Sequence, residues 1–308
     1  MTITKPFLKW VGGKSQILQD VLSLFPKEIH NYHEPFVGGG SVLLGLLSKA
    51  REGAIRITGR VMAYDLNGNL ISLYKNIQHN PDALILHTKR LADDFYRCGE
   101  EHPPNREPRS LEEAMASREN YYYWVRRHFN ALPEDERASP SASAMMLFLN
   151  RTGFRGMYRE GSRGFNVPYG NYKSPAILDE DHIRCVSQLV RNVVFSHKPF
   201  TEALAGVGAG DFVYLDPPYA PETDNSFVSY TANGFSLENH KQLFTICHAM
   251  REQGVMFLMS NADVKLVREA FPNPLYDTRV ILCRRAINAK KPQSVTNEVL
   301  ITNHGERL

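Results

Sequence analysis

Short runs of apolar strand formers alternate along this chain with longer segments whose apolar residues recur at helical spacing. Strands are predicted at 61–65, 192–196, 212–215 and 255–259, with an antiparallel pair at 279–283 and 298–302. Helices are predicted at 17–25, 42–47, 67–77, 81–96, 110–131, 139–150, 179–190 and 236–253. This alternation predicts an α/β fold built on an open parallel sheet.

Capping residues and aromatic clusters refine the helical region in the middle of the chain. Ser110–Glu113 fits a capping box and opens a helix that we expect to reach about Ala131. This helix carries the cluster Tyr121–Trp124, which we interpret as core, with contact to nucleic-acid bases as the alternative. Ser139 precedes a proline at the start of the next predicted helix.

Composition limits the class of protein more than its activity. The 308 residues are enough for one large core, or for one core with an inserted module. The net charge of +3 is too small to identify a partner. No apolar signal core begins the chain and no stretch is apolar over 18 residues, so a cytoplasmic protein without membrane contact is expected. The cysteines lack a C-x-x-C spacing, which argues against zinc-ribbon and thioredoxin sites: Cys98, Cys185, Cys247 and Cys283.

The most informative stretch follows the predicted strand Phe212–Leu215. That strand stops at Asp216, Pro217, Pro218 and Tyr219. Two prolines stiffen the turn, so the acid and the phenol ring are presented at the carboxyl end of the strand, where open α/β sheets bind ligands. A carboxylate and the turn carbonyls can accept the two N–H bonds of an exocyclic amine, and a tyrosine ring can stack on a planar base. The alternative is an ordinary strand-ending turn with a capping aspartate.

Glycines at the beginning of the chain indicate a nucleoside-binding loop. Gly38–Gly40 lie between a strand and a helix, where they allow close backbone approach to a ligand. Leu43 breaks the dinucleotide fingerprint, which argues against a nicotinamide oxidoreductase. Asp65 ends the next strand, as does the ribose-binding acid of nucleoside-cofactor folds. Gly13–Ser15 is not a phosphate-binding loop, because Leu8 occupies the position of its first glycine.

Residues 151–173 carry five basic residues against the single acid Glu160, with aromatic residues and glycines interleaved. This pattern predicts a β-hairpin loop suited to phosphate contacts and to stacking on bases. A solvated hairpin with a few buried rings is the alternative. A second basic cluster occupies 284–291.

Together these motifs resemble the Dam-type DNA adenine methyltransferases. The matching pieces occur in that family's order over most of the chain: Phe7–Lys14, Glu34–Ser41, Asp65–Asn67 with Leu70–Tyr74, Phe165–Gly170 and Asp216–Pro221. The glycine loop and the Asp-Pro-Pro-Tyr turn alone would be less specific, since other amino-methylating enzymes share them. The resemblance implies a Rossmann-like, seven-stranded methyltransferase sheet with helices on both faces. It assigns 1–77 and 191–308 to a catalytic domain and 78–190 to an inserted, mainly helical target-recognition domain that carries the hairpin.

The resemblance also implies S-adenosylmethionine as cofactor, no metal, and double-stranded DNA as partner. Trp10 would lie beside the cofactor's adenine, Asp65 would bind its ribose and Tyr219 would stack on the target adenine. The implied catalytic residues are Asp216, Pro217, Pro218 and Tyr219. The implied cofactor contacts are Trp10, Lys14, Glu34, Phe36, Gly38, Gly40, Asp65 and Asp216.

The implied DNA contacts are Lys9, Phe154, Arg155, Arg159 and Pro168. Readers of GATC usually have an Asn-Gly step where this chain has Arg155 before a glycine. Because arginine favours guanine edges and asparagine favours adenine, two outcomes are open: the change alters the choice of base, or it only adds a phosphate contact. GATC is the first expectation, with CATG or a similar short site close behind.

The predicted reaction is methyl transfer to the exocyclic amino group of an adenine flipped out of a duplex. An RNA or protein-glutamine methyltransferase, or a non-catalytic DNA-binding protein of this fold, are the alternatives. A zinc deaminase is excluded because H-x-E with P-C-x-x-C is absent. A cognate restriction endonuclease is a further candidate partner, and a monomer or weak dimer is expected.

Overall fold

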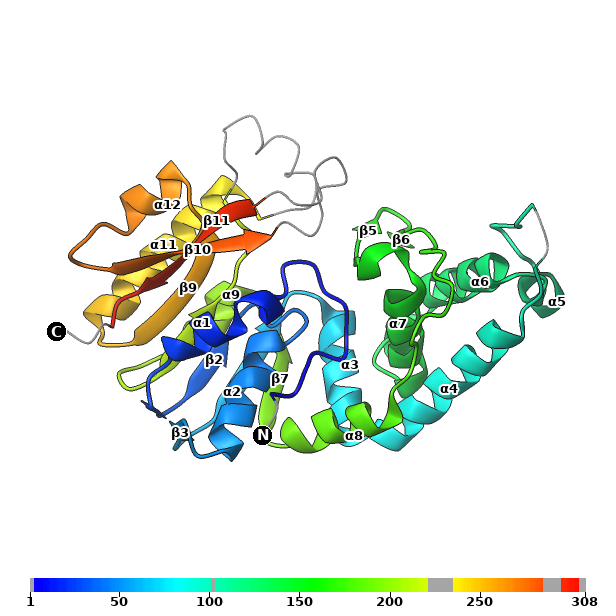
Figure 1. The fold of residues 1–308 in the computed structure, drawn as a ribbon, viewed down its shortest axis with the longest axis horizontal. Coiled ribbons are helices and arrows are strands. Elements are labelled where there is room, and N and C mark those ends of the chain that lie inside the picture. Colours follow the sequence, from blue (N-terminus) through cyan, green and yellow to red (C-terminus); the bar gives the residue numbers. More distant parts are fainter. Residues whose placement is uncertain (1–2, 101–102, 221–234, 285–294, 305–308) are drawn as a thin grey trace.

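The computed structural model describes residues 3–100, 103–220, 235–284 and 295–304. Its centre is a seven-stranded sheet in the order β10-β11-β9-β8-β2-β4-β7 (Figure 1). These strands are β2 Tyr32–Glu34, β4 Val61–Asp65, β7 Val193–His197, β8 Phe212–Leu215, β9 Met256–Ala262, β10 Asp277–Arg284 and β11 Val295–Thr302. The side chains of the basic cluster predicted at 284–291 lie outside the described residues.

The strand order reverses direction at β2. From β2 the chain proceeds outward through β4 to β7, and then returns to β8 on the other side of β2. The neighbours β9, β8, β2, β4 and β7 are parallel, whereas β11 is antiparallel to both β9 and β10. Ligands of such sheets bind beyond the carboxyl ends of the strands that flank the reversal. The expected site is therefore the crevice above β2 and β8.

Helices cover both faces of the sheet, as the hydrophobic core shows. Successive residues of β8 point to opposite faces, so Phe212 and Tyr214 join one buried cluster while Val213 and Leu215 join a second. The second cluster contains the buried side of α11. The helices that accompany the sheet are α1 Leu18–Ser23, α2 Ser41–Arg51, α3 Gly68–His79, α9 Phe200–Ala203, α11 Leu237–Glu252 and α12 Lys265–Ala270. The expected α/β fold, a seven-stranded sheet with helices on both faces, is confirmed.

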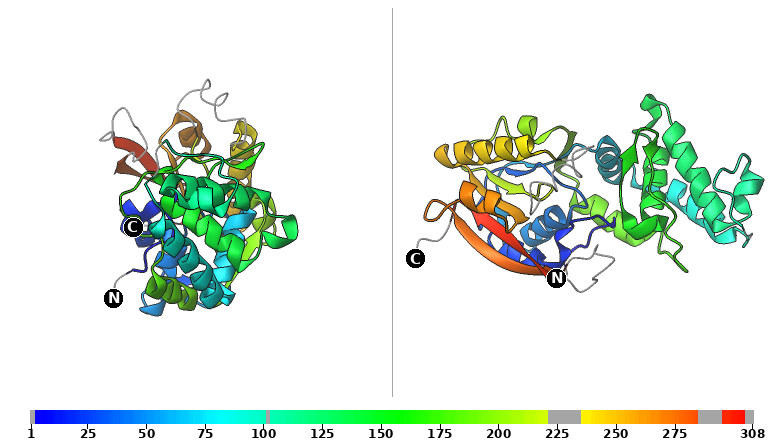
Figure 2. Two further views of the ribbon diagram at one scale, coloured as in Figure 1. Left: turned by 90° about the vertical axis from the view of Figure 1, so that its right-hand side faces the viewer. Right: turned by 90° about the horizontal axis from the view of Figure 1, so that it is seen from above.

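The chain between α3 and β7 forms a separate group of helices that extends to one side of the sheet (Figures 1 and 2). These helices are α4 Pro81–Arg97, α5 Leu111–Met115, α6 Arg118–Ala131, α7 Pro140–Thr152 and α8 Glu180–Leu189. Two small antiparallel strands, β5 Glu160–Gly161 and β6 Gly164–Phe165, form the predicted hairpin. Single-turn 3-10 helices are η1 Lys14–Gln16, η2 Glu134–Glu136 and η3 Phe154–Gly156, and β1 Glu28–Ile29 pairs in parallel with β3 Arg56–Ile57.

Two helix predictions were wrong in detail. The single helix expected from Ser110 to Ala131 is interrupted, because the Ser117 hydroxyl accepts a hydrogen bond from the Asn120 N–H and begins α6 as a new helix. The helix expected at 17–25 is preceded by the 3-10 turn η1 and ends earlier, at Ser23. The cluster Tyr121–Trp124 contributes three buried tyrosines to the core, as predicted.

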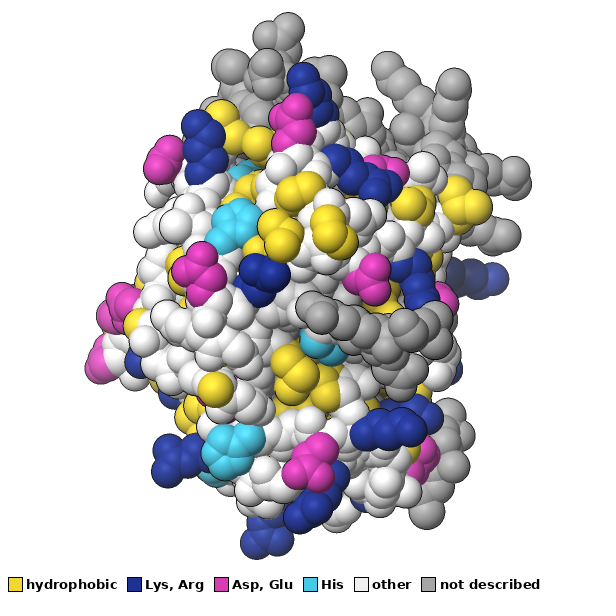
Figure 3. Space-filling view, turned by 90° about the vertical axis from the view of Figure 1, so that its left-hand side faces the viewer, with side chains coloured by type: hydrophobic (Ala, Val, Ile, Leu, Met, Phe, Trp, Pro, Cys, Tyr) yellow, Lys and Arg dark blue, Asp and Glu magenta, His cyan; other side chains and the backbone are white. Residues whose placement is uncertain are grey.

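Figure 3 shows the end of the molecule that lies away from the helices α4 to α7. Acidic, basic and apolar side chains are intermixed on this face, and no patch of one sign dominates it. In the described part of the chain, no helix combines the length and the apolar character that crossing a membrane requires.

Candidate active site

The site is assembled at the carboxyl ends of β2, β4 and β8. The strand β2 pairs with β4 on one side and with β8 on the other, so the segments that follow these strands meet at one edge of the sheet. Asp65, the last residue of β4, accepts hydrogen bonds from the backbone N–H groups of Gly38 (3.0 Å) and Asn67 (2.9 Å). The acid thereby ties the glycine loop to the start of α3. Burial raises the pKa of Asp65, and these backbone donors oppose that rise.

The glycine loop 38–40 is closely packed, which explains its composition. Gly38 and Gly40 have φ angles of 47° and 70°, a region that favours glycine. A Cβ atom on Gly38 or Gly39 would lie 2.9 Å or 2.7 Å from the Trp10 side chain, and one on Gly40 would lie 2.4 Å from the Tyr74 hydroxyl. The Tyr74 hydroxyl donates to the Gly38 carbonyl (2.9 Å). Trp10 therefore lies directly against the loop.

Lys14 and Asp216 form an ion pair that connects the N-terminal segment to the turn after β8. The Lys14 Nζ lies 2.7 Å from the Asp216 Oδ1 and donates to the Gly12 carbonyl (2.8 Å). The lysine side chain is only 4% exposed and the aspartate side chain 19% exposed. Burial raises the pKa of Asp216, the Lys14 ammonium opposes the rise, and the Glu298 carboxylate adds to it. The ion pair favours the ionised aspartate, which is a hydrogen-bond acceptor.

The rest of the Asp-Pro-Pro-Tyr turn is held from β9 and β11. Pro217 is buried and Pro218 is exposed. The Tyr219 hydroxyl donates to the Glu298 Oε2 (2.7 Å), and the Lys14 Nζ lies 4.9 Å from the centre of the Tyr219 ring. Behind the turn, the buried Asn261 accepts a hydrogen bond from the Ala220 N–H (3.0 Å). The tyrosine ring is thus fixed at its hydroxyl end.

Glu34 and Phe36 lie deeper on the same edge. The Glu34 side chain is buried and accepts a hydrogen bond from the Tyr32 hydroxyl (2.7 Å). Burial raises the pKa of Glu34 to about 8, the Tyr32 hydroxyl opposes that rise, and the Asp216 carboxylate adds to it. A cation bound beside Glu34 would favour its ionised form. Phe36 packs against Phe200, with ring centres 5.7 Å apart.

The structure brings Lys9 of the N-terminal segment next to the turn η3, which contains Phe154 and Arg155. Arg155 lies in η3 with a φ angle of 55°, in the left-handed region, and its N–H donates to the Tyr172 hydroxyl (2.9 Å). The Lys9 Nζ lies 4.2 Å from the centre of the Tyr172 ring. Phe154 is exposed at 43%. These side chains form an exposed, cationic and aromatic edge.

Arg159 and Pro168 belong to the adjoining hairpin. The Arg159 Nε donates to the Asn166 Oδ1 (2.6 Å), so this guanidinium is braced within the hairpin. The Pro168 ring is exposed, and its carbonyl accepts a hydrogen bond from the Phe154 N–H (2.9 Å). The predicted DNA contacts therefore form one group, separate from the Lys14–Asp216 pair.

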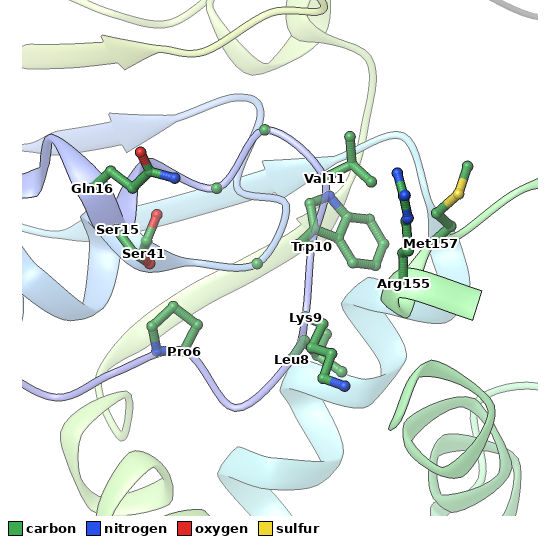
Figure 4. A pocket seen from close by; sticks show the side chains of 13 residues that line it. Pro6, Leu8, Lys9, Trp10, Val11, Ser15, Gln16, Ser41, Arg155 and Met157 are labelled. Carbon is green, nitrogen blue, oxygen red and sulfur yellow. The ribbon is translucent and has the colours of Figure 1, made fainter. Parts of the chain in front are cut away.

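A cavity of about 520 Å³ lies between the N-terminal segment and η3 (Figure 4). Trp10 and Lys9 line one side, and Arg155 and Met157 line the other. Lys14, Asp65 and Asp216 do not line it. This cavity adjoins the sheet-edge site through Trp10 but does not contain the carboxylates. We therefore locate the chemistry at the strand ends, where the buried titratable groups gather.

Two features of the site were missed from the sequence. Glu298 was placed in a strand but was given no role, although its carboxylate holds Tyr219. The only sequence signal was an acid directly before the apolar run Val299–Ile301. Asn150 was assigned to the end of a helix, yet its side chain joins two segments of the site, as described below.

The fold and the site together define an α/β protein with carboxylates gathered at the reversal of its sheet, where sheets of this kind bind ligands. A family model described as D12 class N6 adenine-specific DNA methyltransferase matches residues 10–281, and the chain belongs to this family. It is therefore an adenine-specific DNA methyltransferase.

Among curated relatives, the chain is 35% identical to the Type II methyltransferase M.MjaIII of Methanocaldococcus jannaschii, over 97% of this chain and 99% of that protein. It is 30% identical to the DNA adenine methylase of Haemophilus influenzae, over 98% and 94% of the two chains. The corresponding protein of Escherichia coli K12 is also 30% identical, over 94% and 91%. Among solved structures, TrmN from Thermus thermophilus matches at a TM-score of 0.36 and 10% identity, over 94% of this chain and 48% of that chain.

Proposed function

We propose that this chain transfers the methyl group of S-adenosylmethionine to the exocyclic amino group of an adenine flipped out of a short site in double-stranded DNA. The observation that carries the proposal is the Asp216–Tyr219 turn, held by Lys14 and Glu298 at the sheet reversal. Asp216 offers acceptors for an amine and Tyr219 offers an adjacent aromatic face. Both lie beside a glycine loop suited to a nucleoside cofactor.

The residues at the edge of the sheet fit S-adenosylmethionine. Asp65, although it already accepts two backbone N–H bonds, keeps lone pairs for ribose hydroxyls. Glu34 is a buried carboxyl that a cationic ammonium would favour in its ionised form. Trp10 offers an aromatic surface, and Phe36, Gly38 and Gly40 shape the loop. When bound, the cofactor supplies a methyl group that its sulfonium has already activated.

The protein's own part in the reaction is to position the amine. Asp216 and the Pro217 carbonyl accept the two N–H bonds, which directs the nitrogen lone pair toward the methyl carbon. With the cofactor bound, the nitrogen would take the methyl carbon and the sulfonium would leave as a neutral thioether, and Asp216 would be placed to accept the proton that the methylated amine then loses. Lys14 favours the ionised form of Asp216, so the acceptor is available before the base arrives. Tyr219 stacks on the flipped base and offsets part of the cost of unstacking it.

In this proposal, residues 78–190 form a target-recognition domain, and 1–77 with 191–308 form the catalytic domain. The hairpin and η3 contribute a basic and aromatic edge that suits phosphate contacts and insertion of a ring between bases. Phe154 is the exposed ring. Lys9, Arg155, Arg159 and Pro168 supply the other contacts. The partner is duplex DNA, and a restriction endonuclease of the same specificity is a further candidate partner.

The proposed recognition site is GATC, with CATG or a similar short site close behind. The alternatives to GATC are kept because the Arg155 guanidinium prefers the hydrogen-bond acceptors of a guanine edge. Its left-handed backbone is the conformation in which asparagine is more common. The backbone at this position would therefore also suit an asparagine.

Incorporation of labelled methyl groups tests the proposal directly. Purified protein is incubated with labelled S-adenosylmethionine and, in parallel, with duplex DNA, a single-stranded RNA of the same base composition, and a glutamine-containing protein. Label is expected in the acid-stable adenine fraction of the duplex and not in the other two substrates. Label in the RNA or the protein, with none in the duplex, would overturn the proposed substrate.

A further inference from the structure

One buried side chain joins the segment that carries the cofactor residues to the turn that carries the DNA contacts. Asn150 lies in the last turn of α7 and is only 3% exposed. Its Oδ1 accepts the Lys9 N–H (3.0 Å), and its Nδ2 donates to the Lys9 carbonyl (2.7 Å) and to the Gly156 carbonyl (3.0 Å). A single amide thus pairs with both backbone groups of Lys9 and with η3.

The pairing brings the two segments into close contact. Gly156 has a φ angle of 62°, and a Cβ atom there would lie 2.3 Å from the Lys9 Cβ. The Arg151 guanidinium donates to the Phe7 carbonyl, a second link from the end of α7 to the N-terminal segment. Neither segment can shift against the other without breaking buried hydrogen bonds, each of which is costly to leave unmade.

The next residue along the chain extends this link to the glycine loop. The Trp10 ring is stacked on the Tyr158 ring, with centres 5.8 Å apart and planes 28° apart. The Tyr158 hydroxyl accepts a hydrogen bond from the Asn69 Nδ2 (3.0 Å). The Trp10 side chain also lies against Gly38 and Gly39. A ligand that orders the glycine loop and Trp10 therefore also orders the turn η3.

We propose that Asn150 is a positioning residue that couples cofactor occupancy to DNA recognition, by fixing the Lys9 peptide against the Gly156 carbonyl. The proposal rests on the proposed function and adds a residue to it. Coupling between two binding sites is reciprocal, so the same link must make DNA affinity depend on the cofactor and cofactor affinity depend on DNA. Asn150 touches neither ligand in this account; it acts through Lys9 and η3.

The test measures duplex affinity with and without S-adenosylhomocysteine, using a duplex that carries the site found in a methylation map. For the wild type we expect the nucleoside to tighten specific duplex binding by about 10-fold, within the usual range for coupled sites. Asn150→Asp keeps an acceptor for the Lys9 N–H but removes both donors. We define the coupling ratio as the duplex affinity with the nucleoside divided by the duplex affinity without it. For this variant we expect the coupling ratio to fall to about 1, while the duplex affinity without the nucleoside changes by less than about threefold.

Asn76→Asp is the matched control. Asn76 is also 3% exposed, and its Nδ2 donates to the Ser72 and Ala138 carbonyls and to the Ser143 hydroxyl, away from Lys9 and η3. Asn76→Asp should lose about as much stability as Asn150→Asp and keep the coupling ratio of the wild type. Loss of coupling in both variants would show general destabilisation and overturn the inference.

Tyr158→Leu provides a second route that leaves the buried amide intact. This variant lacks the Tyr158 ring that stacks on Trp10, so its coupling ratio should fall by at least about threefold. The measurement remains possible if Asn150→Asp does not fold. An unchanged ratio in Tyr158→Leu, or a wild type that methylates DNA but shows no coupling, would overturn the inference. A wild type that methylates no DNA would instead refute the proposed function.

Discussion

The turn after β8 and the turn η3 differ in how the fold holds them. The first follows a fully buried strand, and its acid is ion-paired with a lysine that is 4% exposed. The second lies at the surface, with Phe154 exposed at 43% and Arg155 in a left-handed conformation. Interactions in the buried site are strong and preorganised, whereas those at the exposed turn are adaptable. We infer that the chemistry is fixed by the sheet, and that the choice of DNA site can change at η3 without disturbing it.

The largest effect should come from removing the acid of the buried turn. Asp216→Ala should lower the rate of methyl transfer by at least on the order of 10²–10³-fold, because a preorganised acceptor for the amine is lost. Duplex affinity should stay within about threefold of the wild type, since η3 and the hairpin are untouched. Single-turnover transfer and duplex titration measure the two quantities. Substantial turnover by this variant would remove Asp216 from the mechanism.

Tyr219 should show a smaller effect that separates its ring from its hydroxyl. Tyr219→Leu removes the aromatic face and should lower kcat/KM by roughly 10–100-fold, the usual value of stacking on one base. Tyr219→Phe keeps the face and loses only the hydrogen bond to Glu298, so its loss should stay under about 10-fold. Equal losses in the two variants would mean that the hydroxyl, and not stacking, is what matters.

Lys14 should control the pH dependence of the reaction. Burial raises the pKa of Asp216 and the lysine opposes that rise, so activity should be lost as pH falls through the raised pKa. Lys14→Met removes the opposing charge, which should move the acid limb of kcat to higher pH. The profile of kcat against pH at saturating cofactor measures this shift. A shift to lower pH would contradict the assigned role of the ion pair.

Arg155 should produce the smallest effect on rate and the clearest effect on specificity. Arg155→Asn places a residue that tolerates the left-handed region at a φ angle of 55°, so stability should rise by up to about 1 kcal/mol. Preference among sites that differ at one base pair should change by about 1–3 kcal/mol. Thermal unfolding and competition between duplexes give the two values. If Arg155→Asn does not change the preference among DNA sites, Arg155 contacts a phosphate and does not read a base.

Much of the fold follows from local patterns in the sequence. The strand formers at 212–215 and the two prolines after them predict both β8 and its end, and the structure agrees. The antiparallel closing pair was also predicted, and Arg279 pairs with Leu300 in β10 and β11. The break before α6 was missed because Ser117 is one of several serines and threonines in the chain, and nothing local shows that its hydroxyl will cap a helix.

The site could be predicted less completely than the fold. The individual residues Lys14, Asp216 and Tyr219 stand out by their motifs, but which of them contact one another depends on tertiary packing. The Lys14–Asp216 pair joins the beginning of the chain to its last third, and the Tyr219–Glu298 bond joins the turn after β8 to strand β11, across 79 residues. The Asn150 link spans 141 residues. Local sequence carries no signal for such contacts.

The central claim is that Asp216 directs methyl transfer to adenines in one short DNA site. The most direct measurement is a map of modified adenines in plasmid DNA from a methylation-deficient strain that expresses either the wild type or Asp216→Ala. The account predicts near-complete modification of one adenine in a single short sequence with the wild type, and none with the variant. Unmodified adenines despite soluble, cofactor-bound wild-type protein, or the same map with both proteins, would contradict it.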